Sequence, residues 1–232
     1  VEILDNLRSL KPAGVLLAPI GRISKRAAIE KFCANVPTVL FDNTLADLDV
    51  PFVGSDTPQF GALIVDYLCR TGTPPSFVEM ATPANPNANR RRQAYIRAME
   101  AQGHQPHIVK LEGEGWNFEE VGRREGRRAL TNDSFPTGTV LCSNDRIAIG
   151  FLAACYEAGM RTGRTENCEI RVAGQDDHPF SRYTCPPLTT VAQDYDAISR
   201  HSVSTLIERM DDRSSGSKTT LFEGTLIMRE SA

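Results

Sequence analysis

The stretch Val140-Leu-Cys-Ser-Asn-Asp-Arg-Ile-Ala-Ile-Gly150 decides the fold class of this chain. An apolar run of strand type gives way to the polar pair Asn144-Asp145, and a helical pattern begins directly afterwards. Val172-Ala-Gly-Gln-Asp-Asp177 repeats this layout and ends on the pair Asp176-Asp177. In parallel α/β sheets, small ligands bind just beyond the carboxyl ends of the strands, where helix N-termini and short polar side chains converge. The sequence therefore predicts an α/β fold that holds a small polar molecule.

The same alternation of strand and helix patterns runs through the chain. Short apolar runs of strand type lie at 14–18, 37–41, 52–53, 77–78, 139–142 and 170–173, and Leu221–Met228 is expected to form one last strand that closes a sheet edge. Helical patterns lie at 1–10, from Thr57 to Gly72, before Gly103, from Asn117 onward and at 147–158. Strands that alternate with helices imply parallel sheets covered by helices on both faces.

Length and charge limit the kinds of protein that this chain can be. It has 232 residues, with 41% hydrophobic and 24% charged residues, so it can bury a large core as one domain or two lobes. A net charge of -3 argues against a free-standing nucleic-acid binder, because phosphate contacts need clustered, unpaired Lys and Arg. We therefore expect any DNA-reading part to lie elsewhere.

The cysteines and the apolar runs indicate the compartment. Six cysteines are scattered without a C-x-x-C spacing, which favours reduced thiols in a cytoplasmic protein over a disulfide framework. No apolar run approaches the ~20 residues of a membrane span, and no segment resembles a signal peptide.

Catalytic and metal-binding motifs are also missing from the sequence. The four histidines, at positions 104, 107, 178 and 201, lack the spacing of metal ligands and a nucleophile partner. The serines lack a G-x-S-x-G elbow, and no glycine-rich phosphate loop opens a helix. We expect a protein that is not an enzyme and that needs neither a metal nor a cofactor.

The basic run Arg123–Arg128 admits two interpretations. Clustered arginines can contact nucleic-acid phosphates. Glu119 with Arg123 and Glu120 with Arg124 have the i,i+4 spacing of helical ion pairs, each worth roughly 0.2–0.5 kcal/mol. Such pairs favour a solvated helix face over a nucleic-acid contact.

Several motifs taken together resemble the effector-binding domain of the lactose/galactose repressor (LacI/GalR) family, whose fold is that of the two-lobed periplasmic sugar-binding proteins. The matching pieces are Phe52–Asp56 with Gly61, Arg91 three residues before Ala94-Tyr95, Trp116, Ser143–Gly150, Glu157–Gly159, Gly174-Gln-Asp-Asp177 and Pro187–Asp194. They span nearly the whole chain. The chain departs from the family pattern at Ala94, where the family has glycine, and at Gln175, where an aromatic residue is usual.

The resemblance implies an α/β fold of two lobes, each a parallel sheet flanked by helices, linked by hinge crossings. The N-terminal lobe would comprise residues 1–71 and 193–216, and the C-terminal lobe residues 72–192 and 217–232. The chain starts at Val1 within a helical pattern. By the resemblance, the first strands of the N-terminal lobe and a helix-turn-helix head would precede it.

Arg91 and Asp176 are the first ligand-binding residues that the resemblance implies. A guanidinium offers fixed donors that can hold two hydroxyls or a carboxylate. The alternative is that Arg90–Arg92 is a solvated helix start, and the spacing to Tyr95 selects Arg91 from the three. Asp176 would accept hydrogen bonds from ligand hydroxyls, while Asp177 is expected to cap the next turn, although both could be caps.

The resemblance gives five further site residues: Asn144, Asp56, Trp116, Tyr195 and Phe60. Asn144 presents a donor and an acceptor to a ligand or is an N-cap, and its neighbour Asp145 is expected to be the cap. Asp56 would face the cleft, and Trp116 would stack on a sugar or a base, or else pack as a structural residue. Tyr195 would touch the ligand or the hinge, and Phe60, with Ala18, would shape the pocket.

The function implied is the ligand-sensing and dimerisation domain of a bacterial LacI-type transcriptional regulator in the cytoplasm. A sugar or related small metabolite would bind in the cleft between the lobes and control DNA binding by the helix-turn-helix head. A homodimer would match a two-fold operator, and no membrane partner is expected. The alternative is a periplasmic sugar-binding protein of an ABC transporter.

Overall fold

The computed structural model describes residues 2–19, 26–45, 48–211 and 218–232. The chain divides into two compact units, each built from two separate stretches. Unit 1 comprises Val1–Asp56 and Asp194–Glu223, and unit 2 comprises Thr57–Gln193 and Gly224–Ala232.

Unit 1 is built around a four-stranded parallel sheet of order β1-β2-β3-β9. Its elements are α1 (Glu2–Ser9), β1 (Val15–Leu17), α2 (Arg26–Cys33), β2 (Thr38–Phe41), β3 (Phe52–Ser55), α7 (Tyr195–Asp211) and β9 (Thr219–Phe222). Alternate strand residues face opposite sides of the sheet. Leu40 therefore packs with Ile29 of α2, whereas Val39 packs with Ile198 of α7.

Unit 2 contains a second four-stranded parallel sheet, of order β5-β4-β6-β7, and a two-stranded antiparallel sheet of β8 and β10. Its first elements are α3 (Thr57–Thr71), β4 (Ser76–Met80), α4 (Pro86–Ala101), β5 (Ile108–Leu111), α5 (Phe118–Thr131) and β6 (Thr139–Cys142). The remaining elements are α6 (Asp145–Glu157), β7 (Arg171–Ala173), the 3-10 turn η1 (Ser181–Tyr183), β8 (Thr190–Ala192) and β10 (Thr225–Ile227).

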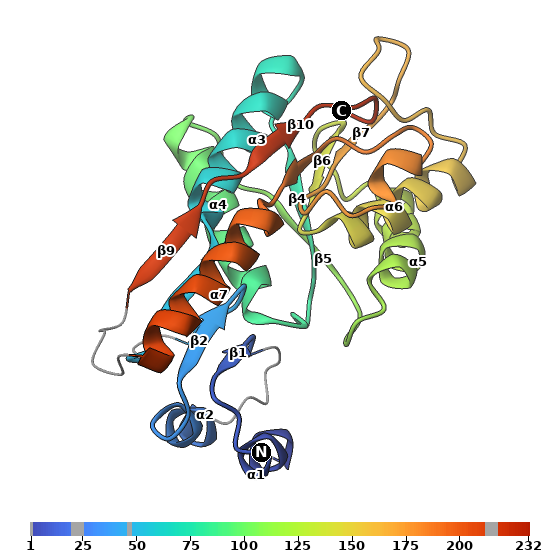
Figure 1. Ribbon diagram of the computed structural model, residues 1–232. Coiled ribbons are helices and arrows are strands. Elements are labelled where there is room, and N and C mark those ends of the chain that lie inside the picture. The colour runs from blue at the N-terminus through green and yellow to red at the C-terminus, as the bar shows by residue number, and fades with distance from the viewer. Residues whose placement is uncertain (1, 20–25, 46–47, 212–217) are drawn as a thin grey trace. The chain divides into compact units, whose positions relative to one another are not determined.

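Helices cover both faces of the larger sheet in unit 2 (Figure 1). The side chains of Phe77, Leu141 and Ala173 join the apolar cluster that includes residues of α3 and α4. Their strand neighbours, such as Val78 and Val140, join the cluster that includes α5 and α6. Because both faces are buried, the strands are continuous apolar runs rather than alternating ones, as the sequence indicated.

Glycines allow two helix pairs in unit 2 to pack closely. A Cβ atom at Gly150 of α6 would collide with the carbonyl of Glu119 in α5, and one at Gly122 would collide with the carbonyl of Ile147. At the α3–α4 contact, a Cβ at Gly61 would lie 2.7 Å from the Cβ of Ala94. Because Ala94 already occupies the space opposite, a residue with a Cβ atom does not fit at position 61.

The predicted α/β class with parallel sheets is confirmed, and all six predicted strand segments contain strands. The prediction of one last strand at Leu221–Met228 is wrong. That segment contributes to β9, which pairs with β3 in unit 1, and to β10, which pairs with β8 in unit 2. The chain changes units between the two strands, at Glu223 and Gly224.

The lobe boundaries proposed from the sequence, after residues 71, 192 and 216, remain predictions. The compact units instead change over after Asp56, Gln193 and Glu223. Helix α3 therefore belongs to unit 2, where its apolar stripe packs against the larger sheet, and β9 belongs to unit 1.

Candidate ligand-binding site

Polar side chains gather beyond the carboxyl ends of β6 and β7 in unit 2. Strand β6 ends at Cys142 and β7 ends at Ala173, and the strands are paired in parallel, so both ends lie at one edge of the sheet. Asp176 follows β7 and forms a bridge to Ala192, next to Gln193. The chain thus brings residues from three separate segments to this edge.

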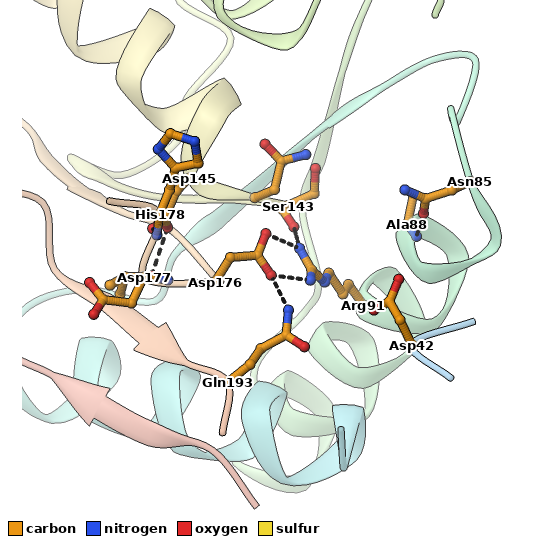
Figure 2. A network of polar contacts seen from close by, with 12 residues as sticks. Asp42, Asn85, Ala88, Arg91, Ser143, Asp145, Asp176, Asp177, His178 and Gln193 are labelled. Atoms are coloured by element: carbon orange, nitrogen blue, oxygen red, sulfur yellow. Dashed lines mark hydrogen bonds and ion pairs between the residues drawn. The ribbon is translucent and has the colours of Figure 1, made fainter. Parts of the chain in front are cut away.

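Arg91 reaches this edge from α4, which begins with the N-cap Asn85 and Pro86. The Asn85 side chain accepts a hydrogen bond from the Ala88 N–H (3.3 Å), which fixes the start of the helix. Arg91 Nη1 donates to the Ser143 carbonyl (2.8 Å) and to Asp176 Oδ2 (3.0 Å), and Nη2 donates to Asp176 Oδ1. The guanidinium and the carboxylate therefore form a two-point ion pair (Figure 2).

The Asp176 carboxylate is the acceptor on which this network centres. Gln193 Nε2 donates to its Oδ1 at 2.6 Å, beside the bonds from Arg91. The side chains of Arg91 and Asp176 are 13% and 23% exposed, so the pair is shielded but reachable by solvent. Asp176 has a backbone φ of 126° and the next residue, Asp177, one of 50°. Residues other than glycine rarely adopt such backbone angles, which marks the turn as strained.

Asn144 is the N-cap of α6, which is one of the two roles expected for it. Its Oδ1 accepts the N–H of Ile147 at 2.9 Å. The prediction that Asp145 is the cap is wrong, because Asn144 already occupies the extended N-cap position with that bond. The amide nitrogen of Asn144 makes none of the hydrogen bonds found among the described residues, so the ligand role stays a prediction.

Asp145 is instead a fully buried carboxylate that joins three segments. Its Oδ2 accepts from the His178 N–H (2.8 Å) and the Ser181 hydroxyl (2.6 Å), and its Oδ1 accepts from the Thr190 hydroxyl (2.7 Å). Burial raises the pKa of this carboxyl from 3.8 to about 6, against the opposing effect of those hydrogen bonds. A Cβ at Gly174 would collide with Asp145, so glycine is required there.

Asp177 does not have the predicted capping role. Its Oδ1 accepts from Arg229 Nη2 at 2.6 Å, in an ion pair whose side chains are 19% and 15% exposed. The ion pair joins residues that are 52 positions apart, and no local sequence pattern around Asp177 predicts it.

Phe60 and Trp116 lie in different surroundings within unit 2. Phe60 is 2% exposed and belongs to the core cluster beneath α3 and α4. Trp116 is 47% exposed and packs edge-on against Phe118, with ring centroids 5.6 Å apart. The packing interpretation of Trp116 has this support, and a ligand role for either residue remains a prediction.

Asp56 and Tyr195 lie in unit 1. The Asp56 N–H donates to the Phe222 carbonyl (2.8 Å), which continues the pairing of β3 with β9. Tyr195 begins α7 and is 54% exposed. Their predicted contribution to a ligand site stays a prediction, as does the pocket role of Ala18, which is also in unit 1.

The basic run of α5 pairs with glutamates, but not in the predicted register. Arg123 contacts Glu120 (3.3 Å) and Glu157 (3.0 Å), and Arg124 contacts Glu125 (2.8 Å). Glu119, the predicted partner of Arg123, instead takes a two-point bond from Arg146, at 2.5 and 2.7 Å.

Within the residues that the structure describes, no three histidine, cysteine or acidic side chains are grouped so that they could hold a metal ion. In those same residues, no helix combines the length and the apolar character needed to cross a membrane. All six cysteines are free thiols.

Two curated proteins are similar in sequence to most of this chain. The ribose operon repressor of Haemophilus influenzae is 27% identical over 234 residues, which cover 99% of this chain and 68% of that protein. The lactose operon repressor of Escherichia coli is 28% identical over 183 residues, which cover 78% of this chain and 48% of that protein. The chain thus spans about half to two thirds of the length of these relatives.

Solved structures share the fold. A lac repressor dimer bound to operator and an anti-inducer matches 98% of this chain and 76% of its own, with a TM-score of 0.83 at 23% identity. A LacI-family regulatory protein from Chloroflexus aggregans matches 98% of this chain and 79% of its own, with a TM-score of 0.80 at 27% identity.

The parallel sheets and the polar edge beyond β6 and β7 define a two-unit α/β domain of the periplasmic-binding-protein type. Residues 68–232 match the periplasmic binding protein-like domain family. The chain therefore belongs to this family, and it is a domain of the LacI type, as the resemblance in sequence implied.

Proposed function

We propose that this chain is the effector-binding and dimerisation domain of a bacterial LacI-type transcriptional regulator. A sugar or related small metabolite binds at the polar edge of unit 2 and controls DNA binding by a helix-turn-helix head in the cytoplasm. One observation carries the proposal: the ion pair of Arg91 and Asp176, with Gln193 on the same carboxylate, lies at the edge where parallel sheets bind small ligands.

The charges at this edge favour a neutral ligand that carries hydroxyl groups. Arg91 and Asp176 neutralise each other, so a neutral ligand adds no unpaired charge. A hydroxyl can donate to Asp176 and accept from Arg91 at once. An anionic ligand would instead compete with Asp176 for the guanidinium.

Relatives support a sugar as the ligand class. Two curated relatives are named as the repressors of the ribose and lactose operons. A solved structure with a TM-score of 0.84 is described as the transcriptional regulator CelR in complex with cellobiose. Ribose, lactose and cellobiose are therefore the first ligands to test.

Binding to these three sugars tests the proposal by isothermal titration calorimetry. We expect wild-type protein to bind at least one sugar, and Arg91→Ala to abolish that binding while circular dichroism stays unchanged. Arg97→Ala is the matched control, because Arg97 is an exposed arginine on the same helix. Unchanged affinity of Arg91→Ala would remove Arg91 from the site, and no binding to any of the three would count against a sugar effector of this kind.

Exposed aromatic side chains in unit 2 support the homodimer. Tyr156 at the end of α6 is 84% exposed, and Phe180 and Tyr183 near η1 are 66% and 77% exposed. Exposed aromatic residues are enriched at protein interfaces. Sedimentation velocity should show a dimer for the wild type and a shift toward monomer for Tyr183→Glu. A wild-type monomer at all concentrations would contradict the dimer.

A further inference from the structure

The turn that carries Asp176 is held in an unfavourable backbone conformation. Asp176 and Asp177 both have positive φ angles, and neither is glycine. Such strain persists only where surrounding contacts hold it, and it is found preferentially at functional sites. The contacts that hold this turn therefore decide where the Asp176 carboxylate points.

The backbone of the turn is fixed on one side by β8. The Asp176 N–H donates to the Val191 carbonyl (2.9 Å), and the Asp177 N–H donates to the Thr190 hydroxyl (3.3 Å). These bonds place the two residues but leave the Asp177 side chain without a role in them. That side chain points away from Asp176 (Figure 2).

Arg229 holds the turn from the Asp177 side. Its Nη2 donates to Asp177 Oδ1 (2.6 Å) and its Nη1 to the Leu188 carbonyl (2.8 Å), while its own N–H donates to the Thr189 hydroxyl (2.9 Å). One guanidinium thus joins the turn to the segment that leads into β8. Both charged side chains are mostly buried, which strengthens the pair.

The segment that supplies Arg229 is itself firmly anchored. Ser231 and Ala232 are fully buried. The Ser231 hydroxyl donates to the Val172 carbonyl (2.6 Å), and the Val172 N–H donates to the Ser231 carbonyl (2.9 Å). Val172 lies in β7, the strand that leads into the turn, so Arg229 starts from a rigid position.

We propose that Asp177 and Arg229 are positioning residues of the ligand site: their ion pair holds the strained turn so that the Asp176 carboxylate faces Arg91. The pair itself need not touch the ligand. The proposal deepens the proposed function, on which it rests for the meaning of the Arg91–Asp176 pair. A pair that served only overall stability would leave the order of the Arg91 guanidinium unchanged.

Side-chain NMR of the arginine-labelled protein measures that order without any ligand. The Arg91 signals are assigned with Arg91→Lys, and the rotation rate of its guanidinium is followed by exchange of the two Nη resonances. Asp177→Gly removes the carboxylate, and glycine readily adopts the φ of 50° found at this position. We expect roughly tenfold faster rotation at Arg91. This is the change expected if the released turn costs the Arg91 guanidinium one of its charge-assisted hydrogen bonds to Asp176.

Three further variants make the test specific. Arg229→Met should speed rotation in the same way, which covers the case that Asp177→Gly fails to fold. Asp177→Asn should speed rotation less than Asp177→Gly does, because asparagine tolerates positive φ and can still accept from Arg229 but carries no charge. Arg146→Met removes the two-point pair with Glu119 elsewhere in unit 2 and should leave Arg91 unchanged.

Unchanged rotation of Arg91 in folded Asp177→Gly or Arg229→Met would overturn the proposal. An equal effect in Arg146→Met would overturn it too, because the response would then report general loosening of unit 2. The readout needs no sugar, so a failure to bind ribose, lactose and cellobiose would count against the proposed function and leave this result standing.

Discussion

Replacement of the buried carboxyl of Asp145 should change how the stability of this protein depends on pH. The folded-state pKa is about 6 and the ordinary value is 3.8, a difference of about two units. At 1.36 kcal/mol per unit, this corresponds to about 3 kcal/mol. Because the folded pKa is raised, this contribution to stability is fully present below about pH 4 and is lost as the pH rises through about 6.

Asp145→Asn removes this titration and keeps most of the hydrogen bonds. The amide oxygen can accept from the His178 N–H and the Ser181 hydroxyl, as Oδ2 does. The amide nitrogen can donate to the Thr190 hydroxyl, which then acts as the acceptor. The variant is therefore expected to fold and to differ from the wild type mainly in charge.

Urea denaturation followed by circular dichroism at pH 4, 5, 6 and 7 measures the effect. The free energy of unfolding of Asp145→Asn, relative to wild type, should rise by about 2 kcal/mol from pH 4 to pH 7, because part of the contribution of about 3 kcal/mol is already lost at pH 4. Asp133→Asn, at an exposed position with a positive φ that asparagine tolerates, controls for the loss of one charge. A difference between Asp145→Asn and wild type that is independent of pH would refute the reasoning.

Two further predictions concern packing and thiol chemistry. Gly150→Ala should lower the free energy of unfolding by about 3 kcal/mol or more, because its Cβ would collide with the Glu119 backbone and force α5 from α6. The control is Gly159→Ala, where φ is 72° and no atom is near, and it should cost only about 1 kcal/mol in the same denaturation assay. Equal losses in the two variants would contradict the packing argument. Cys142 and Cys155 are buried, and burial raises their pKa, that of Cys155 to about 12. They should react with Ellman's reagent only on unfolding, whereas the exposed Cys185 should react at once, and fast reaction of Cys142 or Cys155 in the folded protein, located by mass spectrometry, would contradict this burial.

The fold was predictable from the sequence mainly where the signal comes from residues that are close together in the chain. Apolar runs with intervening helical patterns gave the parallel sheets, because strands buried on both faces must be apolar throughout. The spacing to Tyr95 distinguishes Arg91 from Arg90 and Arg92, and the structure shows Arg91 bonded to Asp176, while its role in ligand binding stays a prediction. The strand signals lie within the residues that form the strands, whereas the partner of Arg91 lies 85 residues away.

The features that were missed depend on distant segments or on a choice between neighbours. Arg229 lies 52 residues from Asp177, and only the folded chain brings the two together. Asn144 and Asp145 are both good N-caps by type, so the sequence could not show that one caps α6 and the other is buried against Ser181 and Thr190. The sequence predicts a single final strand because nothing in residues 221–228 shows that the chain changes units there.

The contacts of Asp145 suggest that its protonation changes stability without changing the site. When ionised, the carboxylate accepts from His178, Ser181 and Thr190. When protonated at Oδ1, it can donate to the Thr190 hydroxyl, so each partner remains hydrogen-bonded. The turn that bears Asp176 should therefore keep its geometry on both sides of the folded pKa of about 6. Guanidinium rotation at Arg91 that is equal at pH 5 and pH 7 is the expected result, and faster rotation at either pH would show that the site itself responds to the proton.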